Sequence, residues 1–246
     1  MNMKVLPTPA ELGKAAAIYA AKLINQAIEK QGRARIILST GASQFKFFES
    51  LVQMDIDWSK VEAFHLDEYI DMPETHPASF RRYLKERFLQ YVNIGKMHFV
   101  NGEGDIPTNL GELAKELDRA PIDLAVIGIG ENAHIAFNDP PADFDTREKF
   151  ILVNLDERCR NQQFGEGWFN TLEEVPKVAI TMTVHQIMQS RAIVSCVPHL
   201  VKADAVKRTI EEKLSNEIPA TILKTHDHWT LFLDEHSASQ LSAASR

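Results

Sequence analysis

The sequence is poor in cysteine and contains no long apolar run, and each absence excludes a class of protein. Only two cysteines, Cys159 and Cys196, occur among 246 residues, too few for the disulfide framework of a small secreted fold. No apolar run approaches the ~18 residues that a membrane-spanning helix requires. The first residues, Met1–Pro7, lack the apolar core of a secretory signal. We therefore expect a cytoplasmic protein with no membrane partner.

An excess of positive charge is also missing. The formal net charge is -7, from 27 basic and 34 acidic residues, and the charges are spread along the chain. Such a surface has no general attraction for nucleic acid or for an anionic membrane. An anionic ligand would therefore have to be held by a local site.

Apolar runs of strand length alternate with amphipathic stretches of helical period. The expected strands cover residues 35–38, 61–66, 97–100, 124–127, 150–153, 178–181, 192–197 and 229–233. The expected helices cover residues 9–30, 45–52, 79–91, 109–118, 183–190, 199–213 and 235–241. This alternation predicts an α/β fold with a mostly parallel sheet covered by helices on both faces. No repeat or Pro/Gly-rich linker divides the chain, so residues 1–246 are expected to form a single domain.

Ligands of open parallel sheets bind at the carboxyl ends of the strands. Directly after the strand at 35–38 comes a loop of small and hydroxyl residues that leads into a helix. It comprises Ser39, Thr40, Gly41, Ala42 and Ser43. A glycine, hydroxyls and a helix N-terminus together can bind a phosphate. The alternative is that Ser43 merely caps the helix.

Two neighbouring carboxylates follow the next strand. Asp67 and Glu68 lie in the segment Leu66–Tyr69, where one of them can act as a general base. Taken alone, the pair fits a solvated turn equally well.

The most polar strand end follows residues 124–127. The segment Gly128–Pro141 contains a Gly-x-Gly pair, Asn132, His134 and Asp139. A histidine transfers protons near neutral pH, and an aspartate beside it can orient and charge-stabilise the ring. This setting favours a functional histidine over a structural one.

Two further segments contain candidate ligands. Lys202 falls at the start of a helix, where a cation gains nothing from the helix dipole, so we interpret it as a partner for an anion, with a solvated lysine as the alternative. His226 and His228 would lie on one side of a strand, but without further ligands nearby they predict no metal site.

In this order the motifs resemble those of the glucosamine-6-phosphate deaminase/isomerase family, which is related to the 6-phosphogluconolactonases. The resemblance covers nearly the whole chain. It rests on the segments 38–41, 67–69, 76–80, 128–140, 175–181 and 202–203. It implies a three-layer Rossmann-like fold that uses no cofactor and no metal, acts on a small phosphorylated amino sugar, and is compatible with a homo-oligomer.

The reaction implied by the resemblance converts a 2-amino-2-deoxyhexose 6-phosphate to a ketohexose 6-phosphate and ammonia. His134 matches the histidine that opens the sugar ring, and Asp67 matches the base that moves a proton from C2 to C1. Glu68, Asn132 and Asp139 complete the catalytic set, with Asp139 where the family usually has glutamate. The loop from Ser39 to Ser43 and Lys202 match phosphate-binding positions. Tyr69 favours the deaminases over the lactonases.

This chain departs from the family pattern at four places. Asn132 replaces the usual aspartate, and an amide cannot give His134 the electrostatic support of a carboxylate. Asp139 is shorter than glutamate by roughly 1.5 Å. Gln162 and Gln163 stand where the family tends to have a phosphate-binding arginine, with Arg158 or Arg160 as replacements. Regulated members of the family have a cluster of hydroxyl and basic residues after Pro140 that serves an amino-sugar effector site. This chain lacks that cluster, so allosteric activation is not expected.

Two alternatives to a deaminase remain open. One is a 6-phosphogluconolactonase-like hydrolase in which His134 activates water. The other is a catalytically impaired sugar-phosphate-binding protein in which Asn132 marks lost chemistry. The sequence does not determine the configuration of the sugar.

Overall fold

A computed structural model describes residues 1–165 and 167–245. Within these residues the main sheet has seven strands, all parallel, in the order β1-β10-β9-β6-β2-β3-β5. They are β1 (Asn2–Leu6), β2 (Ala34–Leu38), β3 (Val61–His65), β5 (Lys96–His98), β6 (Leu124–Ile127), β9 (Ile193–Val197) and β10 (Trp229–Asp234). Every residue of β2, β6, β9 and β10 is buried, as expected for parallel strands covered on both sides.

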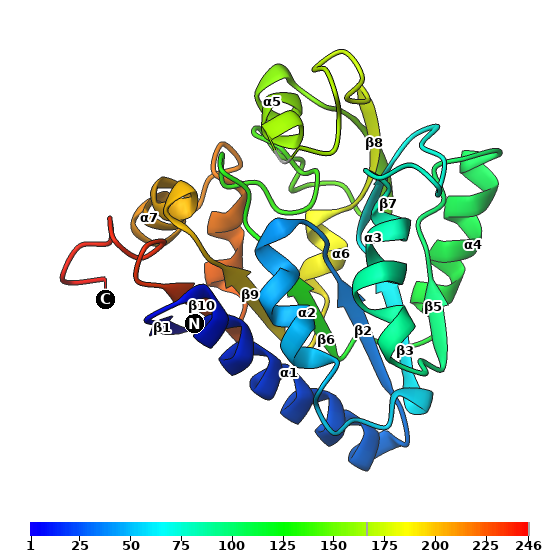
Figure 1. Ribbon diagram of the computed structural model, residues 1–246, viewed down its shortest axis with the longest axis horizontal. Coiled ribbons are helices and arrows are strands. Elements are labelled where there is room, and N and C mark those ends of the chain that lie inside the picture. The colour runs from blue at the N-terminus through cyan, green and yellow to red at the C-terminus, as the bar shows by residue number, and fades with distance from the viewer. Residues whose placement is uncertain (166, 246) are drawn as a thin grey trace.

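Helices cover both faces of the main sheet (Figure 1). One face packs against α1 (Pro9–Gln31), α2 (Phe45–Leu51) and α3 (Phe80–Arg87). The other face packs against α4 (Ile106–Asp118), α6 (Val184–Met188) and α7 (Ala203–Glu211). Short 3-10 turns are η1 (Ala42–Gln44), η2 (Trp58–Lys60), η3 (Leu89–Tyr91), η4 (Leu200–Lys202) and η5 (Pro219–Thr225). The expected three-layer α/β fold is confirmed.

The long helix α1 shows how local sequence signals define an element. Its N-cap, Thr8, accepts a hydrogen bond from the Glu11 backbone N–H at 3.2 Å, and Pro9 occupies the first turn, where its missing N–H costs nothing. Buried positions four residues apart, Leu12 and Ala16, lie on the face that contacts the sheet. Gly32 ends the helix at φ 75°, a left-handed conformation that suits glycine.

A second, antiparallel sheet of three strands lies beside the carboxyl ends of the main sheet. It pairs β4 (Asp67–Tyr69), β8 (Val178–Met182) and β7 (Phe150–Asn154) in the order β4-β8-β7. The sequence pattern predicts two of these strands but not their separation from the parallel sheet. The exposed side of β7, where Leu152 is 56% exposed, is typical of an antiparallel sheet with one solvated face.

Several expected elements differ in the structure. Residues 235–241 form turns rather than a helix: the Ala238 N–H bonds to the Asp234 carbonyl at 3.0 Å, but the Leu241 N–H reaches only three residues back, to Ala238. The histidines His226 and His228 precede β10 in a loop rather than lying in a strand. Strand β1 and helix α5 (Glu157–Gly165) were not anticipated.

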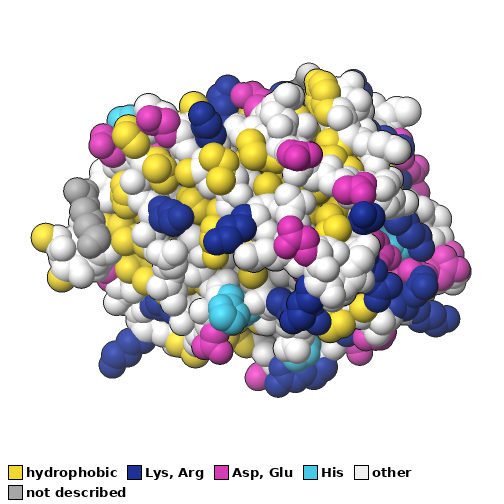
Figure 2. Space-filling view, turned by 90° about the horizontal axis from the view of Figure 1, so that it is seen from below, with side chains coloured by type: hydrophobic (Ala, Val, Ile, Leu, Met, Phe, Trp, Pro, Cys, Tyr) yellow, Lys and Arg dark blue, Asp and Glu magenta, His cyan; other side chains and the backbone are white. Residues whose placement is uncertain are grey.

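The surface agrees with the absence of a strong field of one sign. On the face in Figure 2, acidic and basic side chains are interspersed with hydrophobic ones. Across residues 1–165 and 167–245, no helix combines the length and apolar character that a bilayer crossing demands.

Candidate active site

A cleft lies at the carboxyl ends of four neighbouring strands, β9, β6, β2 and β3. From β2 the chain continues to β3 on one side, whereas β6 leads to β9 on the other, and ligands of such sheets bind where the direction changes. The cleft contains about 550 Å³ of space including its open mouth. It is lined by Ser39, Thr40, Gly41, Ser43, Leu66, Asp67, Phe80, Gly128, Ile129, Gly130, His134, Ala136, Phe137, Gln162, Gln163 and Lys202.

The loop after β2 forms one wall of the cleft. The Ser39 N–H bonds to the Val126 carbonyl at 3.1 Å, which ties the loop to β6. Gly41 adopts φ +96°, a conformation that a residue with a side chain rarely takes. The Ser39 hydroxyl oxygen is buried and makes no hydrogen bond among the described residues, so it can still bind a ligand.

Other members of that loop differ in their placement. Ala42 is exposed and does not line the cleft. Ser43 does line it, and neither η1 nor α2 begins with a side-chain cap. The alternative that Ser43 only caps a helix is therefore wrong.

Asp67 begins β4 and faces the cleft. It is 6% exposed, and its Oδ1 atom is buried without a hydrogen-bond partner in the described chain. Burial, followed by the negative charge of Glu68, raises the pKa of Asp67 to about 8. A carboxyl group in this environment is protonated at neutral pH and becomes a strong base once it ionises.

Glu68 does not line the cleft, because side chains alternate along a strand. It is fully buried, and its carboxylate accepts hydrogen bonds from the Tyr69, Phe80 and Arg81 backbone N–H groups and the Ser79 hydroxyl. The Arg81 guanidinium adds an ion pair at 3.3 Å. Burial raises the pKa of Glu68, and these hydrogen bonds oppose that rise. The side chain therefore holds the N-terminus of α3 in place.

Replacing Glu68 by glutamine is expected to lower the free energy of unfolding by about 1.5–3 kcal/mol, the value of hydrogen bonds to a charged group. The change weakens the hydrogen bonds that the carboxylate accepts and leaves the buried Arg81 with only the exposed Glu103 as an ion-pair partner. Denaturant unfolding measures this loss. Glu49→Gln, which removes an exposed partner of Lys46, should leave stability nearly unchanged. A loss below about 1 kcal/mol for E68Q would contradict the structural role.

His134 and Asp139 form the polar centre of the loop after β6. His134 Nδ1 lies 2.8 Å from Asp139 Oδ1. The Asn132 side-chain amide donates to the same Oδ1 at 3.0 Å, and its own oxygen accepts the His134 backbone N–H at 3.0 Å. Asn132 thus supports His134 through Asp139, which the sequence did not predict.

Burial opposes the ionisation of Asp139, but its contacts with His134, Asn132 and the Cys159 thiol outweigh burial and lower the pKa of the carboxyl. Cys159 is itself buried, and burial, followed by the charge of Asp139, raises the pKa of its thiol. The aspartate therefore stays ionised beside the imidazole, where it orients the ring and stabilises its charged form.

The Gly-x-Gly pair gives the histidine ring its space. A Cβ atom on Gly130 would lie 2.2 Å from His134 Nε2, so no larger residue fits here. The Gly130 N–H bonds to the His134 carbonyl at 2.9 Å, and Ala133 takes φ +69° to close the turn.

Thr181 in β8 links the two polar segments. It pairs with Asp67 across the small sheet, and its hydroxyl oxygen accepts hydrogen bonds from the Phe137 N–H at 3.1 Å and from the Asn138 amide at 3.3 Å. The strand carrying Asp67 and the loop carrying His134 are thereby held by one fully buried residue, the strand through backbone pairing and the loop through the Thr181 hydroxyl.

Two groups of described residues have ligand atoms close enough for a metal. In one, His134, Asp139 and Cys159 lie within 4.8 Å of one another, but the raised pKa of the thiol disfavours the thiolate that binds metals. The other comprises Glu62, His98 and Glu116, which do not line the cleft. Its carboxylates pair with Arg35, Lys96 and Arg119.

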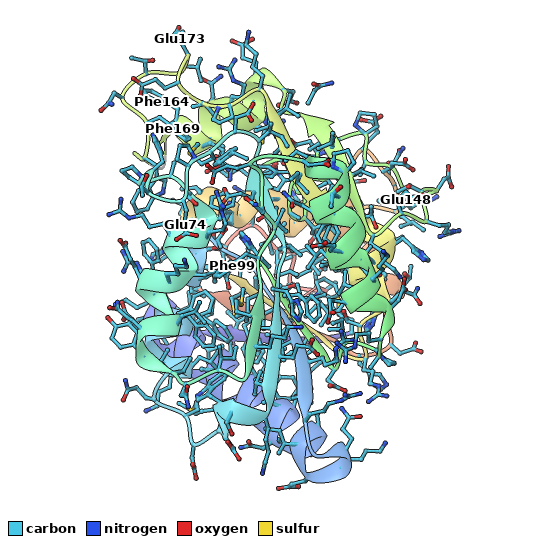
Figure 3. All side chains as sticks on the ribbon, turned by 90° about the vertical axis from the view of Figure 1, so that its right-hand side faces the viewer. Glu74, Phe99, Glu148, Phe164, Phe169 and Glu173 are labelled. Atoms are coloured by element: carbon cyan, nitrogen blue, oxygen red, sulfur yellow. The ribbon has the colours of Figure 1, made fainter. Side chains whose placement is uncertain are left out.

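Helix α5 and the residues after it contribute the part of the cleft that sequence reasoning located least well. Figure 3 shows Phe164 and Phe169 in this segment at the top of the molecule. Gln162 and Gln163 line the cleft, whereas Arg158 is exposed and does not. The Arg160 guanidinium instead donates to the carbonyls of Val175 and Leu172. Neither arginine therefore takes the expected place in the cleft.

Aromatic residues in the cleft were also missed. The rings of Phe80 and Phe137 stack with centroids 5.8 Å apart, and Tyr69 packs 5.0 Å from Phe80. Nothing in the spacing of these residues separates them from ordinary core aromatics.

A parallel α/β sheet with an acid, a histidine and a phosphate-type loop at its switch point defines the site of an enzyme. A sequence model described as "Glucosamine-6-phosphate isomerases/6-phosphogluconolactonase" matches residues 7–232. The chain therefore belongs to the glucosamine-6-phosphate isomerase/6-phosphogluconolactonase family.

Deaminases from two bacteria resemble the chain in sequence. A glucosamine-6-phosphate deaminase of Thermoanaerobacter sp. (strain X514) is 34% identical over 228 residues, which is 89% of this chain and 88% of that protein. One of Lactobacillus delbrueckii subsp. bulgaricus is 31% identical over 98% of this chain and 100% of its own.

Solved structures share the fold. A protein described as a monomeric glucosamine-6-phosphate deaminase has a TM-score of 0.88 at 28% identity, covering 97% of this chain and 99% of its own. A 6-phosphogluconolactonase from Shewanella baltica OS155 has a TM-score of 0.78 at 21% identity, covering 95% and 97%. That second likeness concerns the fold alone.

Proposed function

We propose that this chain deaminates and isomerises a 2-amino-2-deoxyhexose 6-phosphate, giving a ketohexose 6-phosphate and ammonia. The observation that carries the proposal is that Asp67 and His134 line one cleft with the Ser39 loop and Lys202. The deaminase relatives, identical at 31–34% of positions, support the same reaction. Tyr69, which is buried, is the residue that favours the deaminases over the lactonases in the family resemblance.

The proposed steps assign one task to each polar group. His134 moves the proton between the ring oxygen O5 and the anomeric hydroxyl, which opens the ring, while Asp139 stabilises the imidazolium. Ionised Asp67 removes the C2 proton and delivers it to C1 through an enolamine. Water then adds to the resulting C2 imine and ammonia leaves. The Ser39–Ser43 loop and Lys202 hold the phosphate.

A panel of hexosamine 6-phosphates and 6-phosphogluconolactone, assayed for ammonia, ketose phosphate and acid, tests this proposal. Ammonia and ketose phosphate in equal amounts from one hexosamine phosphate are the expected result, and the preferred epimer defines the sugar configuration. Acid release from the lactone without ammonia would identify a lactonase instead. Binding of every sugar without turnover would identify a binding protein.

The Asn132 contact leads to a prediction that separates this chain from relatives with aspartate there. Replacing Asn132 by aspartate puts a second carboxylate beside Asp139, 3.0 Å from Oδ1 in the present geometry, and removes an N–H donor. Like charges at this distance share a proton, so we expect ammonia release to fall about tenfold, the equivalent of one pKa unit.

The double variant N132D/D139E is the matched control. The longer glutamate gives the second carboxylate room to move away from residue 132, so the double variant should recover most of the lost rate. Full activity of N132D alone, measured as steady-state ammonia release at a fixed pH, would show that Asn132 does not support Asp139.

A further inference from the structure

Helix α5 brings two adjacent glutamines to the cleft, at the top of the molecule in Figure 1. Gln163 is 5% exposed and Gln162 is half-buried. Neither has a role in the proposed proton transfers. A buried polar side chain beside a ligand cleft has to satisfy its hydrogen-bonding groups with protein or with ligand.

The carbonyl oxygens of both amides are already occupied. Gln162 Oε1 accepts the Glu131 backbone N–H at 3.3 Å, and since a backbone N–H can only donate, this contact fixes which amide atom is the oxygen. Gln163 Oε1 accepts the Tyr69 hydroxyl at 2.7 Å.

Tyr69 is itself firmly held. It is 1% exposed, and its ring centroid lies 5.0 Å from that of Phe80 and 5.4 Å from that of Phe137. The acceptor side of Gln163 is therefore anchored to the aromatic core.

The amide nitrogens of Gln162 and Gln163 are available to a ligand. In the part of the chain that the structure describes, Nε2 of Gln162 and Nε2 of Gln163 donate no hydrogen bond. Each Nε2 has two N–H donors. The pair therefore offers neutral donors to the cleft.

The charge of the cleft gives these donors their significance. Among its described lining residues, Lys202 is the only lysine or arginine, and Asp67 is an acid. A phosphate monoester has a charge of about -1.5 to -2 near neutral pH, more than one ammonium group balances. The unpartnered Ser39 hydroxyl shows that neutral donors are already available at this site.

We propose that Gln162 and Gln163 form a neutral donor pair that binds the anionic oxygens of the substrate phosphate and so determines specificity for it. This inference rests on the proposed function for the identity of the ligand. In this arrangement amide N–H groups take the place that a second lysine or arginine would have beside the phosphate. Such groups recognise phosphate oxygens through hydrogen-bond geometry rather than through charge.

Glutamate variants test the proposal with minimal change in shape. Gln163→Glu and Gln162→Glu keep an oxygen acceptor for the tyrosine hydroxyl or the backbone N–H, but turn each donor group into an anionic oxygen. Binding of inorganic phosphate, measured by calorimetry on the full chain, should weaken about tenfold or more for each variant. Gln53→Glu, an exposed glutamine outside the cleft, makes the same change in net charge and should have no such effect.

The outcomes separate clearly. If phosphate binds the parent chain and either folded glutamate variant weakens it by more than about fivefold, the donor pair is supported; Q162E decides if the buried Q163E does not fold. A smaller effect in both variants, or no phosphate binding by the parent, overturns the inference. If the variants weaken phosphate binding by less than about fivefold but raise the KM for the sugar, the amides bind sugar hydroxyls instead. That result also overturns the inference.

Phosphate binding requires no catalysis, so this experiment is independent of the deaminase assay. A chain that binds phosphate through the glutamines but releases no ammonia would overturn the proposed function alone.

Discussion

Replacing Asp67 by asparagine is expected to abolish proton exchange at C2 and to lower kcat for ammonia release by about 10²- to 10⁴-fold. Asparagine preserves the shape of a side chain that is 6% exposed but cannot accept the carbon-bound proton. Exchange of the C2 hydrogen with deuterium from solvent, followed by NMR, measures the step directly. Phosphate binding should persist, because Asp67 holds no part of the phosphate anchor.

The exposed Asp227→Asn variant is the matched control, since it makes the same chemical change outside the cleft. It should exchange at the parent rate. Unchanged exchange in D67N would remove Asp67 from its assigned step.

The raised pKa of Asp67 adds a pH signature to this prediction. Below about pH 8 the carboxyl is mostly protonated and cannot act as a base. We therefore expect kcat/KM of the parent to rise about tenfold per pH unit below that value and to level off above it.

The raised pKa also makes Asp67 a determinant of stability. Burial and Glu68 raise this pKa from 3.8 to about 8, so the folded state favours the protonated form. The stabilising contribution of Asp67 is complete below pH 3.8 and is lost as the pH rises to about 8. Asparagine does not ionise, so D67N should lose less unfolding free energy than the parent over this range, by up to about 1.4 kcal/mol for each pH unit crossed. Denaturant unfolding at a series of pH values measures the difference.

Replacing His134 by glutamine is expected to lower ammonia release from a cyclic hexosamine phosphate by about 10²- to 10⁴-fold, because the ring proton transfer loses its acid and base. The loss should be specific for ring opening. A four-carbon 2-amino aldose with its terminal oxygen phosphorylated cannot close a sugar ring, and with this probe H134Q should retain most of the parent rate.

An equal loss of rate on the cyclic and the acyclic probe would assign His134 to the later proton transfer or to folding. His236→Gln, at an exposed position after β10, should match the parent on both probes. Because both substrates are assayed with the same preparation of each variant, the ratio of the two rates does not depend on the fraction of folded protein.

The parallel sheet was predictable because its strands are buried on both sides. The runs at 35–38, 124–127 and 192–197 are nearly continuous in apolar residues, and such runs are typical of a covered sheet. Residues 235–241 have helix-compatible spacing, but the Ser237 N–H is taken by the Asp234 carboxylate at 2.7 Å. A local side-chain contact of this kind competes with helix formation. It cannot be recognised from the spacing of apolar residues along the sequence.

The strand ends that form the candidate site were predictable from the sequence, whereas the directions of their side chains were not. In the sequence Asp67 and Glu68 are equally good candidates for a general base. The pleat of β4 directs Asp67 to the cleft and Glu68 to α3. The support that Asn132 gives Asp139 depends on a turn closed by Ala133 at φ +69°, a conformation uncommon for residues other than glycine. No pattern of residue types reports either fact.

The link through Thr181 joins Asp67 and the His134 loop to the small antiparallel sheet. In the proposed assignment the two reactive groups are held by the small sheet, whereas one part of the phosphate site, the Ser39 loop and Lys202, follows strands of the main sheet. A change in the packing of β7 or β8 would displace Asp67 and His134 together relative to the Ser39 loop and Lys202. Mutations in the small sheet can in this way adapt the cleft to sugars of different length or configuration without touching that part of the phosphate site.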